Sequence, residues 1–224
     1  MKEKYIIVSS LVACITLYII EQYLGVNYAV KTISKIILFV LVPYLYIKFI
    51  RKSDFKTELN IRSLDKKRLR LGFIFGLVSF LIVLIGFVIF QGMIDLERIA
   101  LELQTKSKIT PANFLLIGFY ITFGNSFLEE FFFRGFIFLN LYNLKREKLA
   151  YVYSSLMFGL YHIAIFKTWF SPLIILLCLL GLITVGLLFN WLNTKSKNFI
   201  NSWLVHILAD TAVILIGLRM FNII

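Results

Sequence analysis

Residues 71–94 read LGFIFGLVSFLIVLIGFVIFQGMI and contain no charged side chain. An α-helix of about 20 apolar residues is long enough to cross the hydrocarbon core of a bilayer. The stretch therefore predicts a transmembrane helix. Other apolar runs cover about residues 5–24, 29–50, 111–144, 149–166, 171–194 and 199–218.

The composition agrees with this interpretation over the whole chain. Hydrophobic residues make up 60% of the 224 residues, and the mean hydropathy is +0.87, whereas soluble globular domains are about 45–50% apolar. We expect an all-α, polytopic transmembrane bundle of seven or eight helices with no room for a separate soluble domain. The run 111–144 is too long for one perpendicular span, so we expect it to be tilted or to break near Gly135.

Local signals indicate where several helices begin, bend and pack. Pro43 falls inside the run 29–50 and predicts a kink. Thr110-Pro111 and Ser171-Pro172 each resemble an N-cap followed by proline at the first helical position. Gly181 and Gly186 are typical of positions where two helices pack closely.

Three further features have ordinary structural interpretations. Residues 95–110 are mixed in character and predict a short interfacial helix. The phenylalanines at 131–133 are expected in the core or facing lipid. Both cysteines, Cys14 and Cys178, lie in apolar runs, so we expect packing roles and no disulfide.

The net charge of +12 is best explained by membrane topology. No basic stretch outside the membrane carries interleaved aromatic residues, so we expect the bilayer, and no nucleic acid, as the partner of these charges. If the amino terminus is inside, sixteen Lys and Arg residues lie in inside segments, eight of them in the basic segment 51–70, and seven lie outside. This asymmetry predicts a cytoplasmic amino terminus and an outer carboxyl terminus.

A small set of ionisable residues lies deep in the last four apolar runs. These residues are Glu129, Glu130, Arg134, His162, His206 and Asp210, and the two histidines are the only ones in the chain. Counted along helices from the inner surface at 1.5 Å per residue, they lie roughly 12 to 23 Å deep and can share one layer. Charged residues inside a membrane are costly and usually functional.

The spacings show which of these residues can meet. Glu130 and Arg134 are four residues apart on one helix face and can form an ion pair. Glu129 lies about 100° around the helix from Glu130, so it points elsewhere as a free carboxylate. His206 and Asp210 are also four apart, so the carboxylate can orient the imidazole.

This set of side chains can activate water. A carboxylate in a low-dielectric site can act as a general base, and a histidine can hold the water or stabilise an oxyanion. Two histidines and a glutamate are equally a set of zinc-type ligands. Intramembrane Glu, His and Asp residues also build proton relays, so a non-catalytic membrane protein, either a proton-coupled carrier or an immunity scaffold, is the alternative.

Three spaced motifs carry a family resemblance. They are Glu129-Glu130-x-x-x-Arg134, Phe158-x-x-x-His162 and His206-x-x-x-Asp210. They resemble the motifs of the CPBP family of intramembrane proteases, the CAAX proteases and bacteriocin-processing enzymes that include type II CAAX prenyl endopeptidases. The resemblance covers about residues 110–218, and it implies a catalytic helical core at 110–224 that follows amino-terminal membrane helices and a basic loop at 1–109.

The resemblance also implies roles for the motif residues. Glu129 matches the water-activating glutamate, His162 the histidine that shares that water, and His206 the histidine that stabilises the oxyanion. Asp210 stands where many members have asparagine. An ionised aspartate would repel an oxyanion, so we expect Asp210 to orient His206 or bind a metal.

The remaining motif residues have supporting roles in this comparison. Glu130 and Arg134 match an architectural pair, and Phe158 is expected to pack against the site. A divalent metal such as zinc, at Glu129, His162, His206 and Asp210, is the cofactor of the metalloprotease alternative to a metal-free glutamate mechanism.

By the same resemblance, the substrate is a peptide or membrane-associated protein. The abundance of Lys, Ile, Phe and Asn is typical of an AT-rich genome and favours a bacterial cell membrane as the location. In that setting the family analogy implies peptide maturation or bacteriocin self-immunity.

Overall fold

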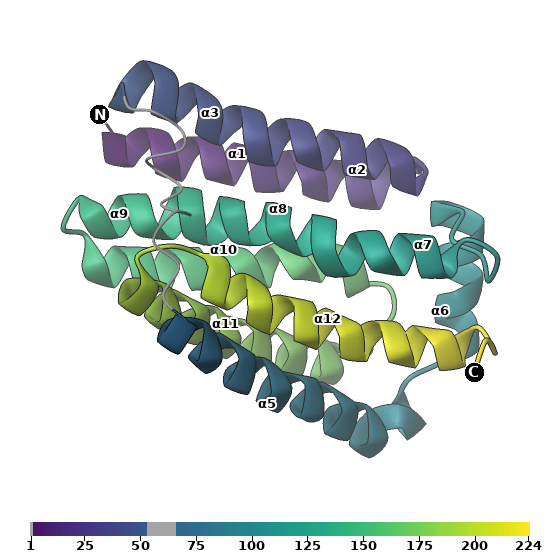
Figure 1. Cartoon of the computed structure of the whole chain (residues 1–224). Helices are drawn as coiled ribbons and strands as arrows, with labels where there is room; N and C mark the ends of the chain where they lie inside the picture. Colours follow the sequence, from purple (N-terminus) through teal and green to yellow (C-terminus); the bar gives the residue numbers. More distant parts are fainter. Residues whose placement is uncertain (1, 53–65) are drawn as a thin grey trace.

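The computed structural model describes residues 2–52 and 66–224, and its regular elements are all helical. Most of the helices run lengthwise beside one another, and the short α6 (Leu96–Glu102) lies across one end of the bundle (Figure 1). The predicted all-α bundle is confirmed. The predicted topogenic loop in the basic segment 51–70 lies mostly outside the described residues.

Six helices are long and apolar enough to cross a membrane. Within the described residues they are Lys2–Tyr23, Tyr28–Arg51, Leu69–Met93, Glu147–Phe166, Pro172–Ser196 and Ile200–Met220. They correspond to six of the seven apolar runs in the sequence. The first is α1, and the last three are α10, α11 and α12. The third consists of α5 (Lys66–Phe90) from Leu69 onward, followed by the 3-10 turn η3 (Gln91–Met93).

The second helix changes its hydrogen-bond pattern on both sides of Pro43. It consists of α2 (Tyr28–Ile36), the π-helical η1 (Ile37–Leu41), α3 (Val42–Leu45) and the π-helical η2 (Tyr46–Arg51). Proline has no backbone N–H and collides with the preceding turn. The structure therefore shows widened π-helical turns on both sides of Pro43.

The remaining apolar run, 111–144, forms one uninterrupted helical path that alternates between α and π geometry. It consists of α7 (Phe114–Phe119), η5 (Tyr120–Asn125), α8 (Ser126–Glu130), η6 (Phe131–Phe138) and α9 (Leu139–Asn143). The break considered near Gly135 does not occur, since Gly135 lies inside η6. π-Helical turns are frequent at functional sites, and this path carries the first motif.

The start of this path corrects one expectation. Thr110 is not its N-cap, because the helix begins at Phe114 after a turn at residues 111–113. The Asn113 side chain accepts the backbone N–H of Thr110 at 2.7 Å and stabilises that turn. The other expected start is confirmed: Ser171 has an extended backbone, and Pro172 occupies the first turn of α11.

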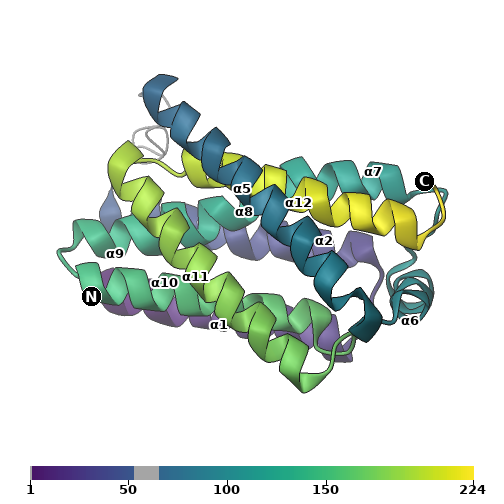
Figure 2. The same ribbon diagram turned by 90° about the horizontal axis from the view of Figure 1, so that it is seen from below.

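The chain ends and connections fall into two groups. The amino terminus, the α9–α10 connection and the α11–α12 connection lie at one end of the bundle, whereas α6 and the carboxyl terminus lie at the other (Figures 1 and 2). The sequence assigned the same segments to opposite sides of the membrane. Which end faces the cytoplasm stays a prediction.

An aromatic core surrounds η6. Phe132 and Phe133 are fully buried, and the ring of Phe132 stacks on that of Phe39 in η1 at a centroid distance of 4.0 Å. Phe133 packs edge-on against Phe158 of α10 at 5.4 Å. These phenylalanines therefore belong to the core and not to the lipid-facing surface, and they fix the helix that carries the first motif against α10.

Close packing of α10 and α11 depends on Gly186. A Cβ atom at Gly186 would lie 3.0 Å from the Cα of Ser155, which is backbone and cannot rotate away. The same atom at Gly181 would meet nothing within 4 Å. Gly186 is a helix-packing position as expected, and Gly181 is not, because it faces open space.

We expect Gly186→Leu to destabilise the protein and Gly181→Leu, its matched control on the same helix, to leave stability unchanged or slightly higher. Overpacking a helix contact costs about 1–3 kcal/mol, whereas replacing an exposed helical glycine removes a propensity penalty of about 1 kcal/mol. Thermal unfolding in detergent measures both. Equal unfolding midpoints for the two variants would contradict the packing at Gly186.

Candidate active site

Three helices bring Glu129, His162 and His206 together. Glu129 lies in α8 and is almost fully buried. Its Oε2 atom lies 3.3 Å from Nε2 of His162 in α10 and 3.7 Å from Nε2 of His206 in α12. One carboxylate oxygen and one nitrogen from each ring thus face a common point, although 77 positions separate Glu129 from His206 in the sequence.

The ring of His162 is fixed by its own helix. Its Nδ1 lies 2.8 Å from the backbone oxygen of Phe158. A carbonyl oxygen can only accept, so Nδ1 carries a proton and donates it, and Nε2 is the nitrogen that faces Glu129. The Phe158 ring also contacts the His162 ring at a centroid distance of 4.4 Å.

The ring of His206 is held by Glu130. Nδ1 of His206 lies 3.0 Å from Oε1 of Glu130, and the same oxygen lies 3.2 Å from Nη1 of Arg134. Both Glu130 and Arg134 are fully buried. The pair is therefore connected to the site through His206, beyond the architectural contact that the spacing predicted.

Arg134 is stacked between aromatic rings. Its guanidinium carbon lies 3.9 Å from the ring centroid of Phe158 and 4.8 Å from that of Phe189 in α11. A flat cation against aromatic faces gains quadrupole attraction, most of all away from water. Within the described residues none of its nitrogens makes a hydrogen bond of good geometry, so the ion pair and the rings hold it.

Asp210 lies beside the His206 ring, as the i,i+4 spacing predicted, but it does not hold the ring by a hydrogen bond. Its Oδ1 atom lies 3.7 Å from Nε2 of His206, too far for a hydrogen bond. Because Glu130 on α8 faces Nδ1, the i,i+4 relation on α12 brings Asp210 to the opposite edge of the ring. The hydrogen bond that orients His206 therefore comes from Glu130.

Three donors that the sequence interpretation missed surround the other oxygen of Glu129. Oε1 lies 3.2 Å from Nζ of Lys35, accepts from Nδ2 of Asn125 at 2.8 Å and accepts from the Tyr161 hydroxyl at 3.2 Å. In the charge count Lys35 is one of the seven outer basic residues, whereas the structure places its Nζ beside Glu129. Its place inside the run 29–50 was the available signal, but a single helix does not reveal which neighbour it will face.

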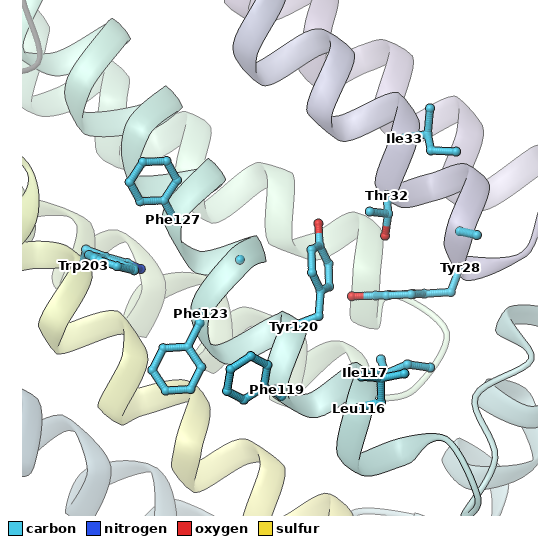
Figure 3. Close-up of a pocket in the computed structure, with 12 residues that line it drawn as sticks. Tyr28, Thr32, Ile33, Leu116, Ile117, Phe119, Tyr120, Phe123, Phe127 and Trp203 are labelled. Atoms are coloured by element: carbon cyan, nitrogen blue, oxygen red, sulfur yellow. The ribbon is translucent and has the colours of Figure 1, made fainter. Parts of the chain in front are cut away.

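An apolar cavity of about 740 Å³ lies between α2, the first-motif path and α12. Its walls come from α2, the α7–η5–α8 path and Trp203 of α12 (Figure 3). Thr32 and Gly124 line it and are close in sequence to Lys35 and Asn125. The cavity thus adjoins the helical turns that carry the donors to Glu129.

The three converging groups fit a metal ion. One ligand atom each from Glu129, His162 and His206 lies within 4.8 Å of the others, and Oε2 of Glu129 is buried with no hydrogen-bond partner in the described part of the chain. Two imidazoles and a carboxylate are a common catalytic zinc set. The same three atoms can equally hold a water molecule beside a general base. Asp210 does not belong to this group.

Comparison with known families finds a match in the carboxyl-terminal half of the chain. Residues 111–212 match the model of a family described as type II CAAX prenyl endopeptidase Rce1-like. The match contains all three motifs. No curated protein and no solved structure matches the chain.

Proposed function

The segment 111–212 is a domain of the CPBP/CAAX protease family, and from this premise we propose that the chain is an intramembrane endopeptidase that hydrolyses a peptide bond with a glutamate-activated water. The observation that supports this proposal most directly is the convergence of Glu129, His162 and His206 from three helices on one point. A peptide or a membrane-associated protein is the substrate.

The first half of the reaction belongs to Glu129 and His162. The lone pair of His162 Nε2 accepts one hydrogen of the water, and Oε2 of Glu129 accepts the other. As the water oxygen attacks the scissile carbonyl carbon, its proton passes to Glu129. The fixed Nδ1 contact of His162 keeps its ring in the orientation that this step needs.

The second half belongs to His206 and again to Glu129. His206 in its protonated form donates from Nε2 to the carbonyl oxygen that becomes an oxyanion, while Nδ1 donates to Glu130. The carbon–nitrogen bond then breaks, and Glu129 returns its proton to the leaving amine. Glu130 and Arg134 position His206 and do not contact the substrate.

If a divalent metal such as zinc is used, Glu129, His162 and His206 would hold it. It would supply Lewis-acid polarisation and lower the pKa of a bound water. Residues of the chain would still orient the ligands, because Phe158 and Glu130 accept the Nδ1 protons of the two histidines.

The experiment compares the membrane peptidome of bacterial cells that express the wild-type chain with that of cells expressing Glu129→Gln at the same level. Peptides or precursors that change only with the wild type are substrates and can be used for kinetic assays of purified protein. Identical peptidomes, with both proteins present in the membrane, would favour the alternative of a carrier or immunity scaffold. Peptide maturation or bacteriocin self-immunity is the role that we propose for the activity.

Asp210→Asn tests the metal question. We expect this variant to keep activity within about tenfold of wild type, because Asp210 makes no hydrogen bond to His206 and lies outside the ligand group. We also expect zinc to affect both proteins alike. The measurement is peptide cleavage after treatment with a strong chelator, with and without added zinc. A weaker zinc response in Asp210→Asn would mean that Asp210 is a ligand.

A further inference from the structure

Lys35 brings a positive charge from outside the catalytic domain to the candidate base. It is the eighth residue of α2, roughly 10 Å along that helix at 1.5 Å per residue, and it precedes the matched segment 111–212 by more than 70 positions. Its side chain is 15% exposed. A largely buried ammonium group in a membrane helix is costly unless a partner compensates it.

Within residues 2–52 and 66–224, the polar and aromatic contacts of its ammonium group belong to the candidate site. Nζ lies 3.2 Å from Oε1 of Glu129, donates to Oδ1 of Asn125 and lies 5.2 Å from the ring centroid of Tyr161. Asn125 and Tyr161 donate to the same oxygen of Glu129. The ammonium, the amide and the hydroxyl therefore act on one carboxylate oxygen.

These contacts determine which oxygen of the Glu129 carboxylate faces the two histidines. With Oε1 occupied by three donors, Oε2 is the oxygen that faces His162 and His206. We propose that Lys35 is a positioning residue of this protease, which fixes Glu129 so that one oxygen alone handles the proton of the water. The proposal rests on the proposed function, and it makes the α2 helix a part of the active site.

If the Lys35–Glu129 pair only stabilised the fold, loss of Lys35 would affect catalysis no more than loss of another ion pair on the same helix. Lys31 provides the comparison, since it lies one turn earlier on α2, is 13% exposed and pairs with Glu21 at 2.6 Å. Loss of either lysine removes one partly buried ion pair from the same helix. Only loss of Lys35 releases the carboxylate that faces the histidines.

The test measures kcat and KM for Lys35→Met, Lys35→Arg and Lys31→Met on a peptide found in the peptidome comparison. A charge-assisted hydrogen bond contributes enough for kcat of Lys35→Met to fall about 10- to 100-fold. We expect KM to stay within about twofold, Lys35→Arg to recover part of kcat and Lys31→Met to match wild type. Equal kcat losses in Lys35→Met and Lys31→Met, or a change in KM alone, would overturn the proposal.

A second variant tests the same arrangement if Lys35→Met fails to fold. Tyr161→Phe removes one hydroxyl donor to Oε1 and keeps the ring, so kcat should fall by about 2- to 10-fold.

The infrared band of the Glu129 carboxylate tests the contact without a substrate. It is isolated by subtracting the spectrum of Glu129→Gln. It should shift in Lys35→Met and not in Lys31→Met. An unshifted band would refute the contact even if no peptide is cleaved, so this result is separable from failure of the protease assignment.

Discussion

Glu129→Gln is expected to lower peptide cleavage by about 10²- to 10⁴-fold, the usual contribution of a general base, while the protein stays folded. The substitution keeps the shape of the side chain and removes its ability to accept a proton. The amide oxygen can still accept from Lys35, Asn125 and Tyr161, as Oε1 of the glutamate does. The amide nitrogen would then face the two histidines and could donate to Nε2 of His162.

Cleavage of a defined peptide by purified protein in detergent or nanodiscs measures this effect. Glu147→Gln is the matched control, because Glu147 is exposed at the start of α10 and touches none of the site residues named above. The thermal unfolding midpoint of Glu129→Gln should stay close to that of the wild type. Full proteolysis by Glu129→Gln would show that another group activates the water.

The helical fold was predictable because the bilayer strongly restricts the backbone conformations that can cross it. Backbone groups in hydrocarbon must bond within their own segment, so an uncharged run of sufficient length is helical. The prediction of 149–166 for one helix is close to the observed Glu147–Phe166. Apolar runs carry no signal for a change from α to π geometry, which is why the alternation through η5 and η6 was not predicted.

The residues of the candidate site could be predicted from the sequence, but several of the contacts between them could not. Charge is scarce inside the membrane, so Glu129, His162 and His206 stood out from the sequence and the structure brings them together. Which carboxylate reaches Nδ1 of His206 depends on how α8 packs against α12, and helical spacing alone pointed to Asp210. Lys35 was missed for the same reason, because its partner lies on another helix.

Arg134→Ala is expected to remove about 3–5 kcal/mol of stability, the usual cost of breaking a buried ion pair by deleting one partner. The side chain is completely buried, so water does not replace the cation beside Glu130, which is left with Nδ1 of His206. The change also removes the contacts of the guanidinium with Phe158 and Phe189. Both losses act on the contact region of η6, α10 and α11.

The double variant Glu130→Gln/Arg134→Met separates the charge effect from the packing effect. Methionine fills part of the space between the two rings, and glutamine no longer brings a charge that needs a partner, so we expect most of the stability to return. The yield of folded protein in the membrane and its thermal unfolding in detergent measure each variant in a double-mutant cycle. If Arg134→Ala unfolded at the wild-type temperature, the buried pair would not stabilise the fold. Because Glu130 also holds Nδ1 of His206, recovered stability without recovered proteolysis would show that this carboxylate serves the chemistry as well as the fold.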